Sequence, residues 1–437
     1  LGVSQPTDVS IIDTEKIFEE GFVTHENAIN ILQFIFELHR EGKLESNHYS
    51  SLHKIPLLTQ KGALLSATNL YLADIYKPRL AIEKFIDIDF FVSEKYLQGY
   101  DSANEWGSFL EKIGVCYDLS RTDLKISIDE VETTTLVYKE YAKEGFRISK
   151  LYSWVSYDGW TDTNRGFGFN VKNIYFNGLP YLQYAENYNF AKMLWQNTIN
   201  KVSPKELFDI HTYADGSTGF YRELEGSYLQ EKGFETSYIQ WVIEHKQIFP
   251  GTDNRCHYAK DLYTNTIPDA KMIAGVYLPV IDVDMLVDES WTSMLGLKKS
   301  FCLQDYLYIL SELSKEKEIL TENRERIEKI YSILATLLPT CTQNQIQQLK
   351  DWATNNKILV KGSSDFLCPK ELSIVMVEGF MGNKFAYTGK DKPSSKLIQL
   401  MRLFGVKVIE QVTPNYIGTP YQKDEIKNRL LVISPLL

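Results

Sequence analysis

The apolar residues of the chain recur every three or four positions over several stretches, a spacing that lines them along one face of an α-helix. The clearest of these stretches are residues 26–40, 101–113, 288–295 and 394–404. Ser102 lies three positions before Glu105, which is the spacing of a helix-capping box. The pattern therefore predicts helices that each bury one face against a core.

Three of these helices end in the same way, with a glycine between two apolar residues. The tripeptides are Ile113-Gly114-Val115, Leu295-Gly296-Leu297 and Phe404-Gly405-Val406, and the chain opens on the related Leu1-Gly2-Val3. A glycine just beyond a helix readily adopts the left-handed conformation that ends many helices. We therefore predict the same joint of helix, glycine and short strand at three places.

A second pattern also occurs three times: a lysine, a short apolar run, a turn with glycine, and another apolar run. It reads KIPLLTQKGALLSATNLYL over residues 54–72, HKQIFPGTDNRCHYAKDLY over 245–263 and KILVKGSSDFLCPKELSIV over 357–375. Short apolar runs on both sides of a glycine turn are typical of a β-hairpin. Each occurrence predicts a small hairpin packed on the helices before it.

The two patterns alternate in the same order along the chain, which predicts an internal repeat. Chance similarity is the alternative, because leucine, glycine and valine are common residues. The predicted copies are copy one over 1–112, copy two over 113–294, copy three over 295–403, and the start of a fourth over 404–437.

Copy two is longer than the others because of an aromatic-rich insertion over about residues 145–233. The runs 166–169 and 173–178 have the residues of strands and turns, and 186–200 has the spacing of a helix. The predicted fold class is therefore α+β: mostly helical units that each carry a small β-hairpin, with an aromatic-rich α+β insertion.

In copy one, a leucine-rich hairpin with a lysine–glycine turn is followed by a tryptophan-containing helix that ends in isoleucine, glycine and valine. The residues of this pattern are Leu57, Leu58, Lys61, Gly62, Leu64, Leu70, Tyr71, Leu72, Trp106, Phe109, Leu110, Ile113, Gly114 and Val115. With this pattern the chain resembles the repeat region of sacsin-like and NO VEIN-like proteins. The resemblance covers the joints and hairpins of copies one and three, and hardly any of the insertion.

In such proteins, an ATPase domain of the gyrase, histidine-kinase and heat-shock-chaperone type is followed by long scaffold regions, and bacterial relatives are suspected in defence against foreign DNA. The resemblance implies a scaffold whose partners are other domains of a parent chain and a protein client. It does not extend to the ATPase, which needs a Glu-x-x-x-Asn helix and an Asp-x-Gly-x-Gly loop. The nearest sequence, Asp215-Gly216-Ser217-Thr218-Gly219, has a different spacing. We therefore expect no cofactor.

Composition narrows the classes of function. The 437 residues carry a formal net charge of −10, and an acidic surface repels phosphate backbones. The five cysteines form no CxxC pair, which favours a reducing, cytoplasmic location. No apolar run reaches the length of about 18 residues that predicts a membrane span. The start at Leu1 and the apolar end at Leu437 favour a piece of a longer polypeptide.

His245, Cys256 and His257 lie close enough in sequence to suggest a metal site. A structural zinc site needs four ligands, usually at paired spacings, and no second pair occurs here. A buried cysteine with two histidines in loops or at the surface explains the residues as well. We favour that interpretation and predict no metal.

Asp282, Asp284, Asp288 and Glu289 form an acidic cluster that has two interpretations. The first is a cation site. The second is the end of a strand followed by the start of a helix, where carboxylates are favourable. We favour the second, because a calcium loop also needs a glycine turn.

The aromatic insertion contains the best candidates for partner binding, because its aromatic side chains are many for one small core. They lie near basic residues that suit an anionic partner. The candidate residues are Arg147, Lys150, Tyr152, Trp154, Tyr157, Trp160 and Arg165. An aromatic-rich core that also contacts another domain is the alternative.

Three hypotheses about function follow from the sequence. The first is a non-catalytic scaffold or regulatory fragment of a large multidomain ATPase, with a chaperone-like or defence role. The second is a module that binds nucleic acid through the insertion, which the acidic net charge disfavours. The third is an enzyme whose catalytic residues are scattered along the chain. We find no complete catalytic set and expect no catalytic activity in this fragment.

Overall fold

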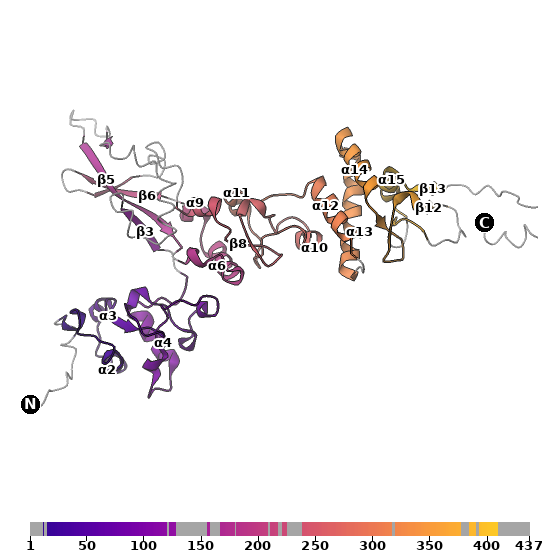
Figure 1. The fold of residues 1–437 in the computed structure, drawn as a ribbon. Helices are drawn as coiled ribbons and strands as arrows, with labels where there is room; N and C mark the ends of the chain where they lie inside the picture. Colours follow the sequence, from indigo (N-terminus) through magenta and orange to yellow (C-terminus); the bar gives the residue numbers. More distant parts are fainter. Residues whose placement is uncertain are drawn as a thin grey trace, which may run out of the picture. The chain divides into compact units, whose positions relative to one another are not determined.

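The computed structural model describes residues 12, 15–119, 122–127, 155–157, 167–179, 181–208, 210–216, 221–224, 238–316, 320–376, 384–389 and 393–409, with the backbone alone for the strands between 122 and 224. These residues belong to two compact units (Figure 1). The first unit comprises Leu1–Pro250, Asn254–Ala259 and Val283–Leu295, and the second comprises Gly251–Asp253, Lys260–Asp282 and Gly296–Leu437. The division falls within the middle copy of the repeat, which contributes residues to both units.

The helices of copy one include the two that the apolar spacing predicts, over residues 26–40 and 101–113, and shorter ones that it does not predict. They are α2 (Ala28–Arg40), α3 (Ser46–Leu52) and α4 (Ala103–Lys112), with short 3₁₀ helices η1 (Lys16–Phe18), η2 (Ala67–Asn69), η3 (Asp74–Tyr76), η4 (Ile82–Lys84) and η5 (Glu94–Leu97). At the start of α4, Ser102 Oγ accepts from the Glu105 amide at 3.3 Å. At its end, Gly114 has a φ of 94°, and the Val115 amide donates to Leu110 O. Both predicted ends of this helix are confirmed.

The core of copy one is aromatic. Phe36 of α2 stacks on Trp106 of α4 with ring centroids 4.0 Å apart, and Tyr100 and Phe109 meet the Phe36 ring edge-on. Trp106 is fully buried. Burying aromatic rings of this size supplies much of the free energy that holds two short helices together.

The predicted hairpin of copy one is present, and it is part of a larger pairing pattern. Strand β1 (Pro56–Leu58) pairs antiparallel with β2 (Leu64–Ser66). Next to the hairpin, Thr59 pairs antiparallel with Val92, and Tyr71 pairs in parallel with both Phe91 and Cys116. Because Cys116 follows Gly114, the chain after α4 returns to the same small sheet.

The same backbone pairing occurs in the other two copies. The hairpins are β8 (Phe249–Pro250) with β9 (Cys256–His257) and β10 (Ile358–Leu359) with β11 (Phe366–Leu367). The antiparallel pairs equivalent to Thr59 and Val92 are Gly251 with Ile281 and Val360 with Ala386. The parallel pairs are Tyr263 with Val280 and Lys298, Ser373 with Phe385, and β12 (Ser373–Val375) with β13 (Lys407–Ile409). Each predicted hairpin is therefore present with the same neighbours.

The remaining helices surround these small sheets. In the first unit they are η7 (Leu182–Tyr184), α6 (Tyr188–Lys201), α7 (Pro204–Phe208), α9 (Tyr238–His245) and α11 (Glu289–Leu295). In the second unit they are α10 (Ala270–Ala274), α12 (Leu303–Leu313), α13 (Thr321–Leu337), η9 (Leu338–Thr340), α14 (Gln343–Asn355), η10 (Pro369–Glu371) and α15 (Ser395–Leu403). A further 3₁₀ helix, η8, spans Ala259–Asp261.

A separate antiparallel sheet forms the α+β insertion. Its strands are β3 (Thr122–Ser127), β4 (Val155–Tyr157), β5 (Phe167–Gly178), β6 (Ile210–Gly216) and β7 (Tyr221–Leu224). The order is β3-β5-β6-β7, and β4 pairs with the other end of β5. Figure 1 labels β3, β5 and β6 of this sheet. The predicted α+β class, with small hairpins and an insertion, is confirmed.

The predicted limits of the insertion, about 145–233, remain a prediction, and the sheet lies partly outside them. The sheet begins earlier, at Thr122, and its strands come from two excursions of the chain on either side of α6 and α7. Helix α6, predicted as part of the insertion, packs on the middle hairpin instead. Trp195 of α6 stacks on Phe249 at 4.2 Å and donates to Ile248 O at 2.7 Å. The apolar spacing predicted this helix but could not show which hairpin it covers.

The predicted ends of the copies remain a prediction, and the pairing bears on where to place them. A boundary between 112 and 113 separates α4 from Cys116, although Cys116 pairs with Tyr71 in the same small sheet. The backbone pairing indicates that each glycine joint belongs with the copy before it.

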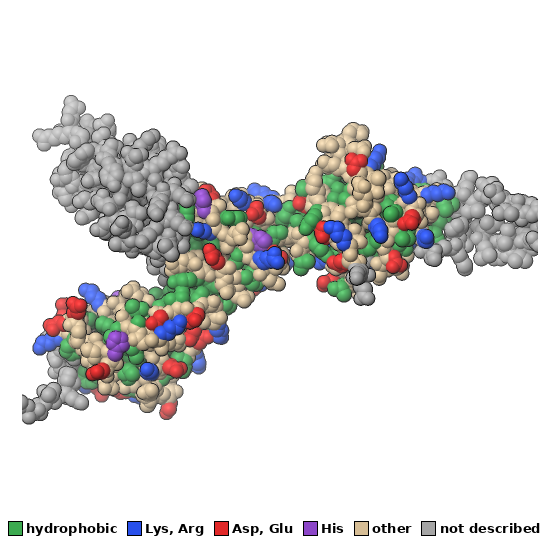
Figure 2. All heavy atoms as spheres, in the orientation of Figure 1, with side chains coloured by type: hydrophobic (Ala, Val, Ile, Leu, Met, Phe, Trp, Pro, Cys, Tyr) green, Lys and Arg blue, Asp and Glu red, His purple; other side chains and the backbone are tan. Residues whose placement is uncertain are grey.

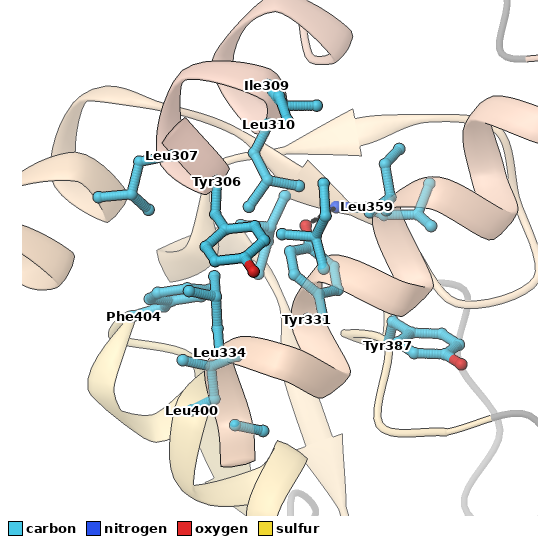
Figure 3. Packing of buried hydrophobic residues seen from close by; sticks show 14 of the residues in the cluster. Tyr306, Leu307, Ile309, Leu310, Tyr331, Leu334, Leu359, Tyr387, Leu400 and Phe404 are labelled. Atoms are coloured by element: carbon cyan, nitrogen blue, oxygen red, sulfur yellow. Dashed lines mark hydrogen bonds between the residues drawn. The ribbon is translucent and has the colours of Figure 1, made fainter. Parts of the chain in front are cut away.

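The second unit has one continuous hydrophobic core, contributed by α10, α12, α13, α14, α15 and the third hairpin. Figure 3 shows Tyr306 and Leu310 facing Tyr331, Leu334 and Phe404 across this core. Tyr387 lies at the edge of the cluster, and its hydroxyl points away from the other labelled side chains (Figure 3). A polar group can therefore sit at this edge without entering the core.

Two further observations concern the class of protein. Within the part of the chain that the structure describes, no helix combines the length and the apolar character needed to cross a membrane. All five cysteines are free.

Candidate functional site

The predicted partner-binding residues of the insertion fall almost entirely outside the described residues. Arg147, Lys150, Tyr152, Trp154, Trp160 and Arg165 are in this group. Tyr157 is the last residue of β4, where its backbone pairs with Phe167 of β5. These residues remain predicted candidates.

The histidines and the cysteine that suggested a metal site have separate partners. His245 Nδ1 lies 2.8 Å from Trp241 O, and its ring stacks on the Trp241 ring at 4.8 Å. Cys256 Sγ is 3.5 Å from Ala185 O. Among the described residues, no three His, Cys, Asp or Glu side chains are grouped in a way that could hold a metal ion.

The acidic cluster divides in the same way. Asp288 Oδ1 accepts from the Trp291 amide at 2.9 Å, so this residue caps the start of α11 as predicted. Asp282 forms an ion pair with Lys271 at 2.9 Å, and Asp284 accepts from Gln196 Nε2 at 2.8 Å. Glu289 Oε1 accepts from Ser293 Oγ at 3.1 Å, so the four carboxylates serve four different local contacts.

The contacts that join one copy to the next form the most distinctive site. In the first unit, the Tyr181 ring lies edge-on to Tyr71 with centroids 5.9 Å apart, and 6.0 Å from the Phe90 ring. The Tyr71 hydroxyl donates to Leu80 O at 3.0 Å. Burial raises the pKa of both Tyr71 and Tyr181 well above the usual value. Both rings therefore remain neutral over the physiological range.

The second unit has a joint of the same design. Tyr263 packs against Phe301 with centroids 4.6 Å apart, and Lys298 Nζ lies 4.9 Å from the centroid of the Tyr263 ring. Burial raises the pKa of Tyr263, and so does its hydrogen bond to the Asp305 carboxylate. Asp305 also accepts from the Cys302 amide at 2.6 Å, at the start of α12. The joint is thus fixed to the first helix of the next copy.

The two joints correspond residue by residue. Tyr71 and Tyr263 hold the same position in the backbone pairing. Tyr71 pairs in parallel with Phe91 and with Cys116, which follows the glycine, and Tyr263 pairs in the same way with Val280 and Lys298. Tyr181 and Phe301 each come shortly before the first helix of the following copy. In copy three the equivalent position is Ser373, so that copy has no aromatic ring there.

A further aromatic contact supports the first strand of each hairpin. The Leu58 amide donates to the Tyr96 hydroxyl at 2.7 Å, and the Leu359 amide donates to the Tyr331 hydroxyl at 3.2 Å. In the middle copy, Trp195 Nε1 donates to Ile248 O just before β8. A buried backbone group is costly to leave without a partner, so these rings fix the hairpin on the helices.

Sequence reasoning did not identify Tyr181 or Phe301 as joint residues. Phe301 lies three positions after Lys298, a spacing that a search beyond the glycine could have found. Tyr181 is separated from Cys116 by the first excursion of the insertion, which hides the same relation. The two are related because each contacts the tyrosine that holds the same place in the backbone pairing.

Comparisons of this chain with protein-family models, with curated proteins and with solved structures found no match.

Proposed function

We propose that this chain is a non-catalytic scaffold that couples neighbouring structural copies through aromatic joints. In this role it would transmit the state of a partner, such as an ATPase domain of a larger polypeptide, to another part of the same assembly. The observation that carries the proposal is the pair of equivalent joints, Tyr71 with Tyr181 and Tyr263 with Phe301.

Two features support coupling at a joint. In repeat proteins, stability is shared between each copy and its interface with the next one. Here the joint tyrosines are almost fully buried, at 0% exposure for Tyr71 and 3% for Tyr263, and their backbones pair on both sides. A displacement of the next copy would therefore disturb the small sheet of the copy before it.

Hydrogen–deuterium exchange of the whole chain tests this proposal. The Tyr181→Ala variant removes the ring that covers Tyr71, so exchange should rise in α6 and also in residues 70–72 and 115–116 of copy one. The Phe301→Ala variant should raise exchange in α12 and in residues 262–264.

Tyr184→Ala is a matched control for the first joint. The Tyr184 ring meets the Phe190 ring of the following helix edge-on, with centroids 6.5 Å apart. Loss of the Tyr184 ring should therefore raise exchange in residues 182–194 alone. If Tyr181→Ala left residues 70–72 and 115–116 at wild-type exchange, the joint would not couple the copies, and the scaffold proposal would lose its main support.

A further inference from the structure

A cavity of about 380 Å³ opens in the second unit, beside the first turns of α13. Its walls come from α13, from the turn between β10 and β11, and from the segment 384–389. The lining side chains include Thr321, Arg324, Glu325, Glu328, Lys361 and Tyr387. This volume is in the range of small-molecule sites, which start near 300 Å³.

The floor of the cavity is a polar cluster of Arg324, Glu328 and Tyr387, of which Glu328 and Tyr387 are buried. The Glu328 side chain is 9% exposed, and its Oε1 accepts from Arg324 Nε at 3.2 Å. Arg324 Nη1 donates to Ser363 O at 2.9 Å, in the hairpin turn. The Tyr387 hydroxyl donates to Glu328, and burial together with the Glu328 charge raises the pKa of Tyr387 to about 12. Three elements thus hold the guanidinium and the carboxylate in place.

The rim adds one charge of each sign. Lys361 and Glu325 are both exposed and both line the cavity. The Lys361 amide donates to Phe385 O at 2.8 Å, which fixes the start of its side chain beside the third wall. The lining therefore carries two cationic and two anionic side chains, so it favours neither a simple anion nor a simple cation.

In copy one, the residue equivalent to Lys361 has a side-chain partner within the same copy. Gln60 corresponds to Lys361, because its amide donates to Phe91 O in the same way. The Gln60 side chain donates to Glu83 Oε1 at 2.8 Å, so a residue of the same copy fills that place. Glu83 lies in the chain between the paired segments of copy one. Among the residues that the structure describes, Lys361 has no such side-chain partner.

We propose that this cavity binds a small zwitterion that carries both a carboxylate and an ammonium group, such as a free α-amino acid. The carboxylate would lie between the Arg324 guanidinium and Lys361. The ammonium group would face Glu325 and the Glu328 carboxylate. Arg324 Nη2, for which no described residue is an acceptor, supplies a donor already fixed in direction.

Saturation-transfer difference NMR on the whole chain tests the proposal. The probes are a mixture of common L-α-amino acids, with propionate and propylamine as analogues of single charge and inorganic phosphate as a purely anionic probe. We expect a signal for at least one amino acid at millimolar concentration, and none for the other three probes. Equal signals from propionate or phosphate would overturn the assignment to a zwitterion.

Two exposed residues at the rim separate binding from folding. Lys361→Ala and Glu325→Gln should each weaken amino-acid binding by at least about fivefold, because each removes one charge-assisted contact. Lys350→Ala, a change at an exposed residue of α14, should leave binding unchanged, and thermal unfolding should be the same in all three variants. The absence of any amino-acid signal, or binding that neither rim variant weakens, would refute the proposal. Neither result bears on the joints, since the cavity lies apart from Tyr263 and Phe301 in sequence and in its lining.

Discussion

Copies one and three share a backbone pairing pattern but build it from different side chains. In copy one the support is aromatic, with Phe36, Trp106 and Tyr96 around the hairpin. In copy three, aliphatic side chains such as Leu310 and Leu334 surround Tyr331, and the Tyr387 and Phe404 rings lie farther off, with centroids 6.3 and 6.5 Å from the Tyr331 ring (Figure 3). The repeat therefore keeps its hydrogen bonds and glycines, while the core that packs on it can change.

The largest expected effect separates the glycine joints of these two copies. Gly114 and Gly405 have nearly the same φ, 94° and 93°. A Cβ on Gly114 would lie 2.9 Å from His53 Cδ2, whereas a Cβ on Gly405 meets nothing within 4 Å. Gly114→Ala should therefore cost about 3 kcal/mol, from backbone strain and a clash, and Gly405→Ala only about 1 kcal/mol from strain.

Exchange of the α4 and α15 amides measures the two costs in the same experiment. Gly296→Ala is the control, because its φ is 67° and its surroundings are equally open. Equal losses at Gly114 and Gly405 would show that packing around the joint does not distinguish the copies.

A smaller difference is expected where a tyrosine supports each hairpin. Tyr96→Phe and Tyr331→Phe remove the acceptors of the Leu58 and Leu359 amides, and each should cost about 1–3 kcal/mol. The Tyr96 variant should lose more, because its hydrogen bond is 2.7 Å long and that of Tyr331 is 3.2 Å. Amide exchange at Leu58 and Leu359 measures this, and a larger loss at Leu359 would contradict the prediction.

The sequence predicted which helices and hairpins form in these copies better than it predicted which residues pack against one another. Glycines such as Gly114 and caps such as Ser102 are local signals, because they depend on a few adjacent residues, and the structure confirms both. The covering of Tyr71 by Tyr181 depends on residues separated by an excursion of the chain, so no periodicity reveals it. The floor of the cavity likewise needs Glu328 and Tyr387, which only tertiary packing brings together.

Alkaline pH should lower the free energy of unfolding of both copies progressively. Burial, with hydrogen bonds to Glu37 and Glu328 respectively, raises the pKa of Tyr100 and Tyr387 to about 12. An unfolded tyrosine titrates near about 10, so between pH 10 and 12 the unfolded state loses protons first and stability falls as pH rises. Urea unfolding at pH 9, 10 and 11 should show this decline. Tyr387→Phe should reduce it, and an unchanged slope would argue against a raised pKa in copy three.

The smallest effect is expected for nucleic acid. On the face shown in Figure 2, basic and acidic side chains of the described residues are interspersed. A chain of net charge −10 should show no salt-dependent binding of labelled DNA or RNA, and Trp154→Ala or Arg165→Ala should change nothing. Tight binding that weakens with salt and with either substitution would instead favour a nucleic-acid module in the insertion.

The strands of the insertion sheet come from two parts of the chain, before and after α6 and α7, and this affects the order of folding. Phe176 of β5 pairs with Ile210 of β6, and the chain between these two residues includes α6 and α7. If this connecting chain were a flexible loop, closing it would have an entropic cost before any contact between the strands formed. Helices that have already packed on the middle hairpin would bring the two strands together in advance. During synthesis, this sheet should therefore be completed only after the ribosome has released the hairpin at 249–257.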